Sequence, residues 1–371
     1  MKLVIISHTP HYTKGGNYLG WGPTINEINH LSKLFSKIYH IAPLHDDEKC
    51  PKSSLPYRSS KIKYIPIRPG GGKSILAKIK FLLSVPSNLK TIHRICNNID
   101  FIHLRTPTNI ALYVLPYLYF YSGKLRWVKY AGNWNQKNAP FSYEIQRLWL
   151  KKNLQRSFVT INGTWPNQKP HILSFENPCV TEIELNKTKN IIRKKTYNKK
   201  LNLCFVGRLE KEKGVSLLIS ALEKIKDKSF INTVYIVGEG PSLKDNSCRA
   251  SKINDVSIIF KGPISRMELN QIYEISHIII HPSLSEGFPK VLAEAAAYGC
   301  VPIVSKVGSI GQYIDKRNGI LLNNISSDAI ITALISLEKN RKELQKKAFE
   351  SYYLSKKFTY ERYNRRILRL F

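Results

Sequence analysis

The chain has 371 residues, 43% of them hydrophobic, and a formal net charge of +32. This length predicts two domains of about 180 residues each, and the hydrophobic content excludes a disordered protein. The six cysteines are scattered and form no C-x-x-C pair. Their spacing favours a reduced, cytoplasmic protein and argues against a zinc site.

No targeting or membrane-spanning segment is expected. Met1 to Ser7 is a short apolar strand without a signal-peptide cleavage region. The longest apolar stretch, Ile110 to Tyr121, contains Pro116 and is too short to span a bilayer. We therefore expect a buried helix there.

The basic charge reflects a shortage of acidic residues in the first half. Residues 1–178 contain 25 basic and 7 acidic residues, against 33 and 19 in the remainder. This excess of positive charge favours an anionic partner: a phospholipid surface, a nucleic acid or a phosphorylated acceptor. A lysine-rich genome would produce the same bias, and composition alone does not separate these explanations.

The first half begins with a strand, Lys2 to Ile6, a glycine-rich loop that contains Gly15 and Gly16, and a helix from Thr24 to Phe35. Further strands are expected at Ile62 to Ile67, Phe101 to Leu104, Trp127 to Tyr130 and Phe158 to Ile161. Helical stretches separate several of them. This alternation predicts an α/β domain with a doubly wound parallel sheet.

The segment from Lys73 to Val85 has the pattern of a basic amphipathic helix. One helical face carries Leu76, Ile79 and Leu83. The surrounding lysines, and the proline that ends the run, are Lys73, Lys78, Lys80 and Pro86. Such a helix can lie in an anionic membrane interface, which favours peripheral attachment. The alternative is that its apolar face packs onto the sheet.

The second half repeats the alternation after a break at Asn177-Pro178. Its expected strands are Leu201 to Val206, Thr233 to Val237, Ser257 to Phe260, Ile278 to His281 and Val301 to Val304. The basic stretch from Lys187 to Lys200 is interpreted as a surface segment near the interdomain linker, and Lys356 to Phe371 as a basic helix. The two halves resemble one fold used twice.

Glu286 and Glu294 stand at the most informative place in the chain. A strand ends before Pro282, a helix begins after Pro289, and the next strand starts at Val301. Glu286 lies in the turn and Glu294 about two helical turns beyond it, so both carboxylates can reach one ligand at the carboxyl edge of a sheet. Alternatively, Glu294 is an ordinary charge on the face of the helix, and Glu286 interacts with the dipole at the helix N-terminus.

The surrounding residues resemble a known signature. The run HPSLSEGFPKVLAEA, followed by GCVPIVS, is similar to the donor site of retaining nucleotide-sugar glycosyltransferases of the GT-B fold, family four. The resemblance implies two Rossmann-like domains facing a cleft. It also implies that Glu286 contacts the transferred sugar as a catalytic residue and Glu294 binds the ribose. Neighbouring donor-binding residues would be Gly287, Phe288 and Lys290.

A second element resembles the diphosphate grip of that family. Gly207-Arg208 ends a strand and Lys213-Gly214 opens the next helix, as in G-R-x-x-x-x-K-G. Arg208 and Lys213 would neutralise the charge that develops on the leaving nucleoside diphosphate. The chain has no D-x-D motif, so a mechanism without metal or other cofactor is expected.

Several glycine turns complete the resemblance. Gly238 and Gly262 each follow a strand and resemble the glycine turns that line the nucleotide in this family. A glycine turn that binds no ligand would have the same sequence. Gly15 and Gly16 resemble the loop that approaches donor phosphate and acceptor, although a plain turn would look the same. The family often has a histidine where this chain has Asn133, and we expect Asn133 to bind the sugar instead.

Through this resemblance the sequence predicts a hexosyltransferase. The enzyme would transfer a sugar from a UDP or GDP sugar to a glycan acceptor that is lipid-linked, in the synthesis of bacterial surface polysaccharide. We expect an acceptor domain at residues 1–178, a donor domain at 179–355 and a returning helix at 356–371. The enzyme would lie on the inner face of the cytoplasmic membrane. The alternatives are a basic nucleic-acid-binding protein, which lacks a recognisable module here, and an epimerase or phosphorylase of the same fold.

Overall fold

The computed structural model describes residues 1–45, 50–72, 74–121 and 123–371. The chain divides into two compact units: Met1–Glu176 with Tyr363–Phe371, and Asn177–Arg362. The division thus falls two residues before the expected one, and the C-terminal segment joins the first unit from Tyr363 onward. Lys73 of the expected amphipathic helix lies outside the described residues.

A parallel sheet forms the centre of the first unit. Among the described residues its strand order is β10-β9-β8-β7-β1-β4-β6. The strands are β1 (Lys2–Ile6), β4 (Lys37–Pro43), β6 (Ile62–Ile67), β7 (Phe101–Thr106), β8 (Leu125–Tyr130), β9 (Phe158–Ile161) and β10 (Ile172–Ser174). Along β1, Val4 and Ile6 face one core while Leu3 and Ile5 face the other. Both faces of the sheet are therefore covered, as in a doubly wound fold.

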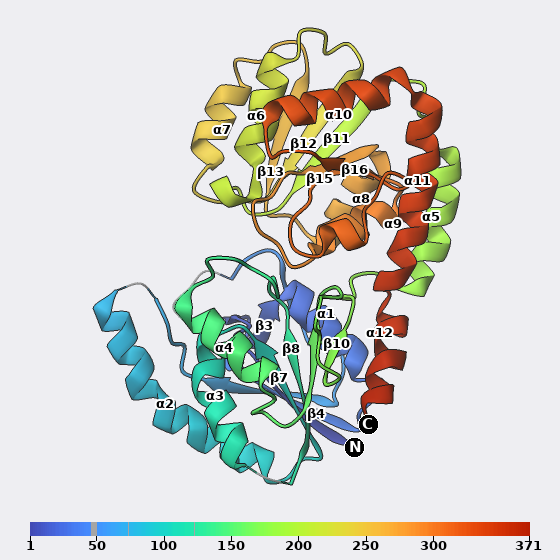
Figure 1. The fold of residues 1–371 in the computed structure, drawn as a ribbon. Coiled ribbons are helices and arrows are strands. Elements are labelled where there is room, and N and C mark those ends of the chain that lie inside the picture. Colours follow the sequence, from blue (N-terminus) through green and yellow to red (C-terminus); the bar gives the residue numbers. More distant parts are fainter. Residues whose placement is uncertain (46–49, 73, 122) are drawn as a thin grey trace. The chain divides into compact units, whose positions relative to one another are not determined.

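Helices cover the two faces of this sheet (Figure 1). Residues of α2 (Ile75–Cys96), α3 (Asn109–Phe120) and α4 (Phe141–Lys151) pack in one core. Residues of α1 (Gly22–Leu31) and of the C-terminal helix α12 (Tyr360–Ile367) pack in the other. The parallel sheet with helices on both faces confirms the predicted α/β class.

Helix α2 differs from the expectation in length. It continues through Pro86 to Cys96, because Pro86 lies on the exposed face, where water can satisfy the carbonyl that loses its N–H partner. Its predicted apolar face does not pack onto the sheet. Leu76, Ile79 and Leu83 are 63%, 48% and 71% exposed.

Two other expectations for the first unit need correction. The glycine-rich loop is an antiparallel hairpin of β2 (His11–Lys14) and β3 (Asn17–Trp21), joined by β5 (Ser54–Pro56). Helix α3 is not wholly buried, because Phe120 is 82% exposed. No helix in the described part of the chain is both long and apolar enough to cross a bilayer.

The second unit has its own parallel sheet, with the described strands in the order β13-β12-β11-β14-β15-β16. They are β11 (Leu201–Val206), β12 (Ile231–Val237), β13 (Ser257–Gly262), β14 (Ile278–His281), β15 (Val301–Ser305) and β16 (Ile320–Leu322). The chain adds strands outward from β11 as far as β13 and then returns to the other side of β11 with β14. The strand order therefore reverses between β11 and β14.

The helices of this unit also form two layers (Figure 1). On one face lie α6 (Val215–Lys224), α7 (Leu243–Ala250) and α10 (Ser327–Lys339), and on the other lie α5 (Glu182–Lys194), α8 (Arg266–Ile275) and α9 (Lys290–Ala297). Helix α11 (Arg341–Ser355) follows α10 and contributes Tyr352 to the second layer.

The basic segment expected at the linker is mostly helix. A capping box of Thr181 and Glu184 starts α5, and Leu185 and Ile192 are buried on its inner face. Tertiary packing of these few apolar residues stabilises a helix that composition alone did not reveal.

Candidate functional site

The two sequence motifs of the second unit meet where the strand order reverses. Strand β11 ends at Val206 and β14 ends at His281, and the two strands are paired neighbours. The loops that follow are tied together, because Leu284 N donates to Glu212 O at 2.8 Å. At Gly214, which has φ of 79°, a Cβ would overlap the Pro282 carbonyl oxygen. Ligands of open α/β sheets bind at this edge.

Glu286 is held in this loop by three donors. Lys213 Nζ lies 2.5 Å from Glu286 Oε1, His281 Nε2 3.1 Å and Ser283 Oγ 3.2 Å. All three contacts are to Oε1, which leaves Oε2 without a donor among the described residues. The carboxylate is thus fixed in orientation with one oxygen available to a ligand.

The ionisation of Glu286 follows from these contacts. Burial alone would raise its pKa, but the contacts with His281 and Lys213 outweigh burial, and the pKa is lowered. The side chain therefore carries a negative charge at neutral pH. A fixed negative charge can accept hydrogen bonds from sugar hydroxyls and stabilise positive charge on a sugar ring.

Arg208 does not join this cluster. Its Nε lies 3.1 Å from Glu210 Oε2, and its side chain is 70% exposed. The structure therefore brings Lys213 and Glu286 together and leaves Arg208 beside them, where the end of its side chain is open to solvent. A phosphate at the end of β11 would be within the range of motion of a long exposed arginine.

Glu294 lies on α9 and pairs with a residue that the sequence analysis did not single out. Arg266 Nη1 lies 2.5 Å from Glu294 Oε1, and Tyr273 OH lies 3.5 Å from Oε2. Burial lowers the pKa of Arg266, but Glu294 together with neighbouring acidic groups outweighs burial, so the pKa is raised. The Arg266 guanidinium is therefore charged. The capping box at Ser265 and Glu268 marks the start of α8, but no sequence signal links Arg266 to Glu294.

The residues between the two glutamates have different environments. The Gly287 carbonyl accepts hydrogen bonds from Ser309 N and Oγ, both at 2.9 Å. The Phe288 ring is buried and stacks on Phe358 at 4.5 Å, so its side chain belongs to the core. Lys290 is the first residue of α9 and is partly exposed. Its role in donor binding stays a prediction.

The two glycine turns close the same edge. Gly238 N donates to Gly262 O at 3.0 Å, and Gly207 N donates to Val237 O at 3.0 Å. A Cβ at Gly238 would overlap the Gly207 carbonyl oxygen, whereas one at Gly262 would meet nothing within 4 Å. Gly238 is therefore required for the approach of two loops, and Gly262 has open space around it.

The candidate residues of the first unit occupy separate loops. Gly15 and Gly16 form the turn of the β2–β3 hairpin with φ of 57° and 74°, and a Cβ at either would meet nothing within 4 Å. Asn133 follows β8, and its Oδ1 accepts a hydrogen bond from Asn135 N at 3.1 Å. Part of the Asn133 side chain is thus used to hold its own turn.

A polar cavity of about 460 Å³ lies at the carboxyl edge of the first sheet. Its lining follows the ends of four strands: His8 after β1, His45 after β4, Gly70 after β6 and Thr108 after β7. Lys80 of α2 also borders it. This polar cavity has the position expected for a ligand of a doubly wound domain.

Across the described residues, no group of three or more His, Cys, Asp or Glu side chains is arranged to hold a metal ion. The positive charges near the candidate donor residues include those of Lys213, Arg208, Lys290 and Arg266.

Residues 186–352 match the model of the family described as glycosyl transferases group 1. The matched residues all lie within the second unit. The match includes Arg208, Lys213 and both glutamates. The candidate donor residues of the second unit therefore lie in the matched part, whereas Gly16 of the first unit lies outside it.

Curated relatives are similar over part of the chain. An uncharacterized glycosyltransferase of Methanocaldococcus jannaschii is 26% identical over 51% of this chain and 50% of its own length. A Bacillus subtilis protein named as a teichuronic acid biosynthesis glycosyltransferase, TuaC, is 28% identical over 36% of this chain and 32% of its own. The chain thus spans about half or less of the length of these relatives.

Solved structures match the whole chain. Sucrose-phosphate synthase from Thermosynechococcus elongatus has a TM-score of 0.72 at 15% identity, over 100% of this chain and 98% of its own. Anabaena HepE, solved in complex with UDP, has a TM-score of 0.69 at 15% identity over 100% and 99%. The two parallel-sheet units therefore have the GT-B glycosyltransferase fold, which confirms the predicted fold class.

Proposed function

We propose that this protein is a retaining, metal-independent glycosyltransferase that moves a hexose-type sugar from a UDP or GDP sugar to a lipid-linked glycan. The main support is the ion pair of Glu286 and Lys213, at the edge of the sheet where the strand order reverses. Both residues lie in the part that matches the group 1 family model. A role in bacterial surface polysaccharide is supported by the name of TuaC and by a similar Klebsiella pneumoniae protein from a cps region. HepE, with the same fold, was solved with UDP and with UDP-glucose.

The proposed chemistry uses the groups at this edge. The bond between the anomeric carbon and the phosphate oxygen breaks, and the acceptor oxygen bonds to the same face of the sugar. The acceptor proton passes to the departing phosphate oxygen. Lys213 and Arg208 stabilise the charge that grows on the diphosphate, so no metal is needed for that task. Glu286 Oε2 orients the sugar, and Glu294 accepts hydrogen bonds from the ribose.

Peripheral attachment to the inner face of the cytoplasmic membrane is part of the proposal. Five residues of α2 form an exposed apolar strip, here called the α2 stripe: Ile75, Leu76, Ile79, Leu82 and Leu83. Helix α2 contains no acidic residue. An apolar face among lysines is suited to anionic phospholipid headgroups.

The test is a panel of nucleotides and their sugar conjugates in thermal unfolding, with Glu294→Ala beside the wild type. A ligand that binds only the folded state raises the melting temperature. The proposal expects UDP or GDP to raise it in the wild type and much less in the variant. If no nucleoside diphosphate does so, and random DNA binds with strong salt dependence, the nucleic-acid alternative replaces it.

A further inference from the structure

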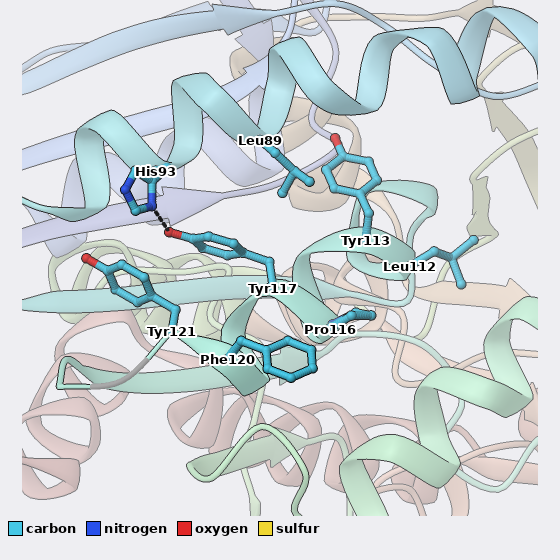
Figure 2. A pocket seen from close by; sticks show the side chains of 8 residues that line it. All are labelled: Leu89, His93, Leu112, Tyr113, Pro116, Tyr117, Phe120 and Tyr121. Atoms are coloured by element: carbon cyan, nitrogen blue, oxygen red, sulfur yellow. Dashed lines mark hydrogen bonds between the residues drawn. The ribbon is translucent and has the colours of Figure 1, made fainter.

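A second cavity of the first unit, of about 610 Å³, lies between α2 and α3 (Figure 2). Its apolar walls come from Leu89 of α2 and from Leu112, Pro116 and Phe120 of α3. In the described part of the chain, no lysine, arginine, aspartate or glutamate lines it. We call it the apolar cavity. It is an open depression on the surface, and its apolar lining suits a hydrocarbon chain that lies along it.

The polar groups at this cavity already have partners within the protein. Tyrosine hydroxyls make the following contacts: Tyr113 with Asn88 Nδ2 at 3.4 Å, Tyr117 with His93 Nδ1 at 3.1 Å, and Tyr121 with Asn97 Oδ1 at 3.1 Å. A bound sugar would need donors and acceptors for its own hydroxyls. A hydrocarbon chain needs only apolar surface, which the cavity provides.

The apolar cavity and the polar cavity lie along the same two helices, α2 and α3, and no residue that the structure describes lines both. Ile110 borders the polar cavity, and Leu112 and Tyr113, within one turn of it on α3, border the apolar cavity. On α2, Lys80 borders the polar cavity, and the next residue, Phe81, contacts the Tyr113 ring at 5.9 Å between centroids. A ligand that follows the two helices could place a polar head in the polar cavity and an apolar tail in the apolar cavity.

The charge of α2 indicates what kind of head this ligand has. Basic residues alone carry charge along the helix, at Lys78, Lys80, Lys90 and Arg94. Lys80 lies at the polar end, where it can pair with a phosphate. The α2 stripe lies on the same helix, and none of its residues lines the apolar cavity.

We propose that the apolar cavity holds the hydrocarbon chain of a lipid phosphate acceptor, with its phosphate beside Lys80 in the polar cavity. The inference rests on the proposed function and names its acceptor class: a lipid phosphate or diphosphate that carries the glycan. The α2 stripe would then contact the membrane, and the apolar cavity would hold the hydrocarbon chain of the acceptor.

The experiment measures binding of octyl, decyl and dodecyl phosphate below their micelle concentrations, with inorganic phosphate as the headgroup probe. Affinity should rise about tenfold for each two added methylenes in the wild type. Leu112→Trp, which fills the cavity, should remove this dependence on chain length. Leu83→Ser, on the stripe but outside the cavity, should leave it unchanged. Leu89→Trp repeats the test if Leu112→Trp does not fold.

A dodecyl phosphate with a terminal diazirine, photolysed on the wild-type protein, gives an independent readout. Label on peptides of α2 and α3 supports the proposal, whereas label elsewhere overturns it. A dimer in solution that Leu112→Trp dissociates would assign the cavity to self-association and also overturn it. UDP-sugar binding is measured on the same samples. If it is present without the chain-length dependence, this inference fails alone; if it is absent from the wild type, the proposed function fails.

Discussion

Lys213 Nζ and Glu286 Oε1 lie 2.5 Å apart, although 73 positions separate the two residues in the chain. Without a ligand, each side chain neutralises the other in a partly buried loop pair, with 24% and 13% of the side chains exposed. A donor diphosphate would attract Lys213 and leave Glu286 to the sugar. The same arrangement recurs at Arg266 and Glu294. The basic partners therefore hold both carboxylates in place before the donor binds.

Glu286→Gln keeps the size of the side chain and removes its charge. We expect the rate of sugar transfer to fall by about 100-fold or more, because charge stabilisation in the transition state is lost. The rise in melting temperature with UDP or GDP should remain, because nucleotide contacts lie elsewhere. Glu210→Gln, which removes the surface partner of Arg208, is the matched control. A transfer rate equal to wild type would remove Glu286 from the catalytic residues.

Glu294→Gln tests the ribose site against a purely structural pair. We expect nucleotide affinity to fall roughly tenfold to 100-fold, because hydrogen bonds to a charged acceptor are lost. The loss should also appear in an Arg266→Met background, measured by titration calorimetry. If Glu294→Gln has no effect in that background, the carboxylate acts only through Arg266, and the assignment to ribose is wrong.

The lowered pKa of Glu286 predicts a pH dependence of stability. Its folded pKa lies below the usual value of 4.5, so its contribution is full above that value and is lost as the pH falls through the folded pKa. We expect the difference in unfolding free energy between wild type and Glu286→Gln to be constant near neutral pH and to shrink in acid. Denaturant unfolding measures it. A difference that grows in acid would mean that the pKa is raised.

Much of this site follows from local sequence. Apolar runs bounded by glycine or proline located β11 and β14 to the residue, and the meeting of parallel strand ends explains how Lys213 and Glu286 come to lie together. The Arg266–Glu294 pair depends on the packing of α8 beside α9, which no short pattern encodes. Strand β4 escaped notice because His40 interrupts its apolar residues, although the ring is fully buried between Ser7 and Tyr57.

The β2–β3 hairpin and helix α2 are two further features that the sequence analysis predicted only in part. The Gly15-Gly16 pair is itself a signal for a two-residue hairpin turn, and both glycines have positive φ, but only a glycine-rich loop was expected there. Periodicity identified the apolar face of α2 correctly. It did not tell whether that face was covered, because an exposed apolar stripe and a buried one have the same spacing.

Substitutions can separate the role of Asn133 in its own turn from its proposed contact with the sugar. Asn133→Asp keeps the oxygen that accepts from Asn135 N and removes the amide donor. We expect about a tenfold loss of transfer from one lost hydrogen bond, with little change in melting temperature. Asn133→Ala should lower both transfer and melting temperature. If Asn133→Asp transfers sugar as well as wild type, the amide does not contact the substrate.

The α2 stripe predicts which membranes the protein binds. The double variant Leu76→Ser and Leu83→Ser should lose roughly tenfold or more in affinity for vesicles with anionic phospholipid, because two exposed apolar side chains no longer enter the interface. Added salt should weaken the remaining binding. The matched control is Ile183→Ser, which removes an apolar side chain that is 67% exposed on α5. Vesicle flotation measures all three proteins. Equal flotation of the double variant and the control would show that the stripe does not contact lipid and that the basic charge of the first unit serves another partner.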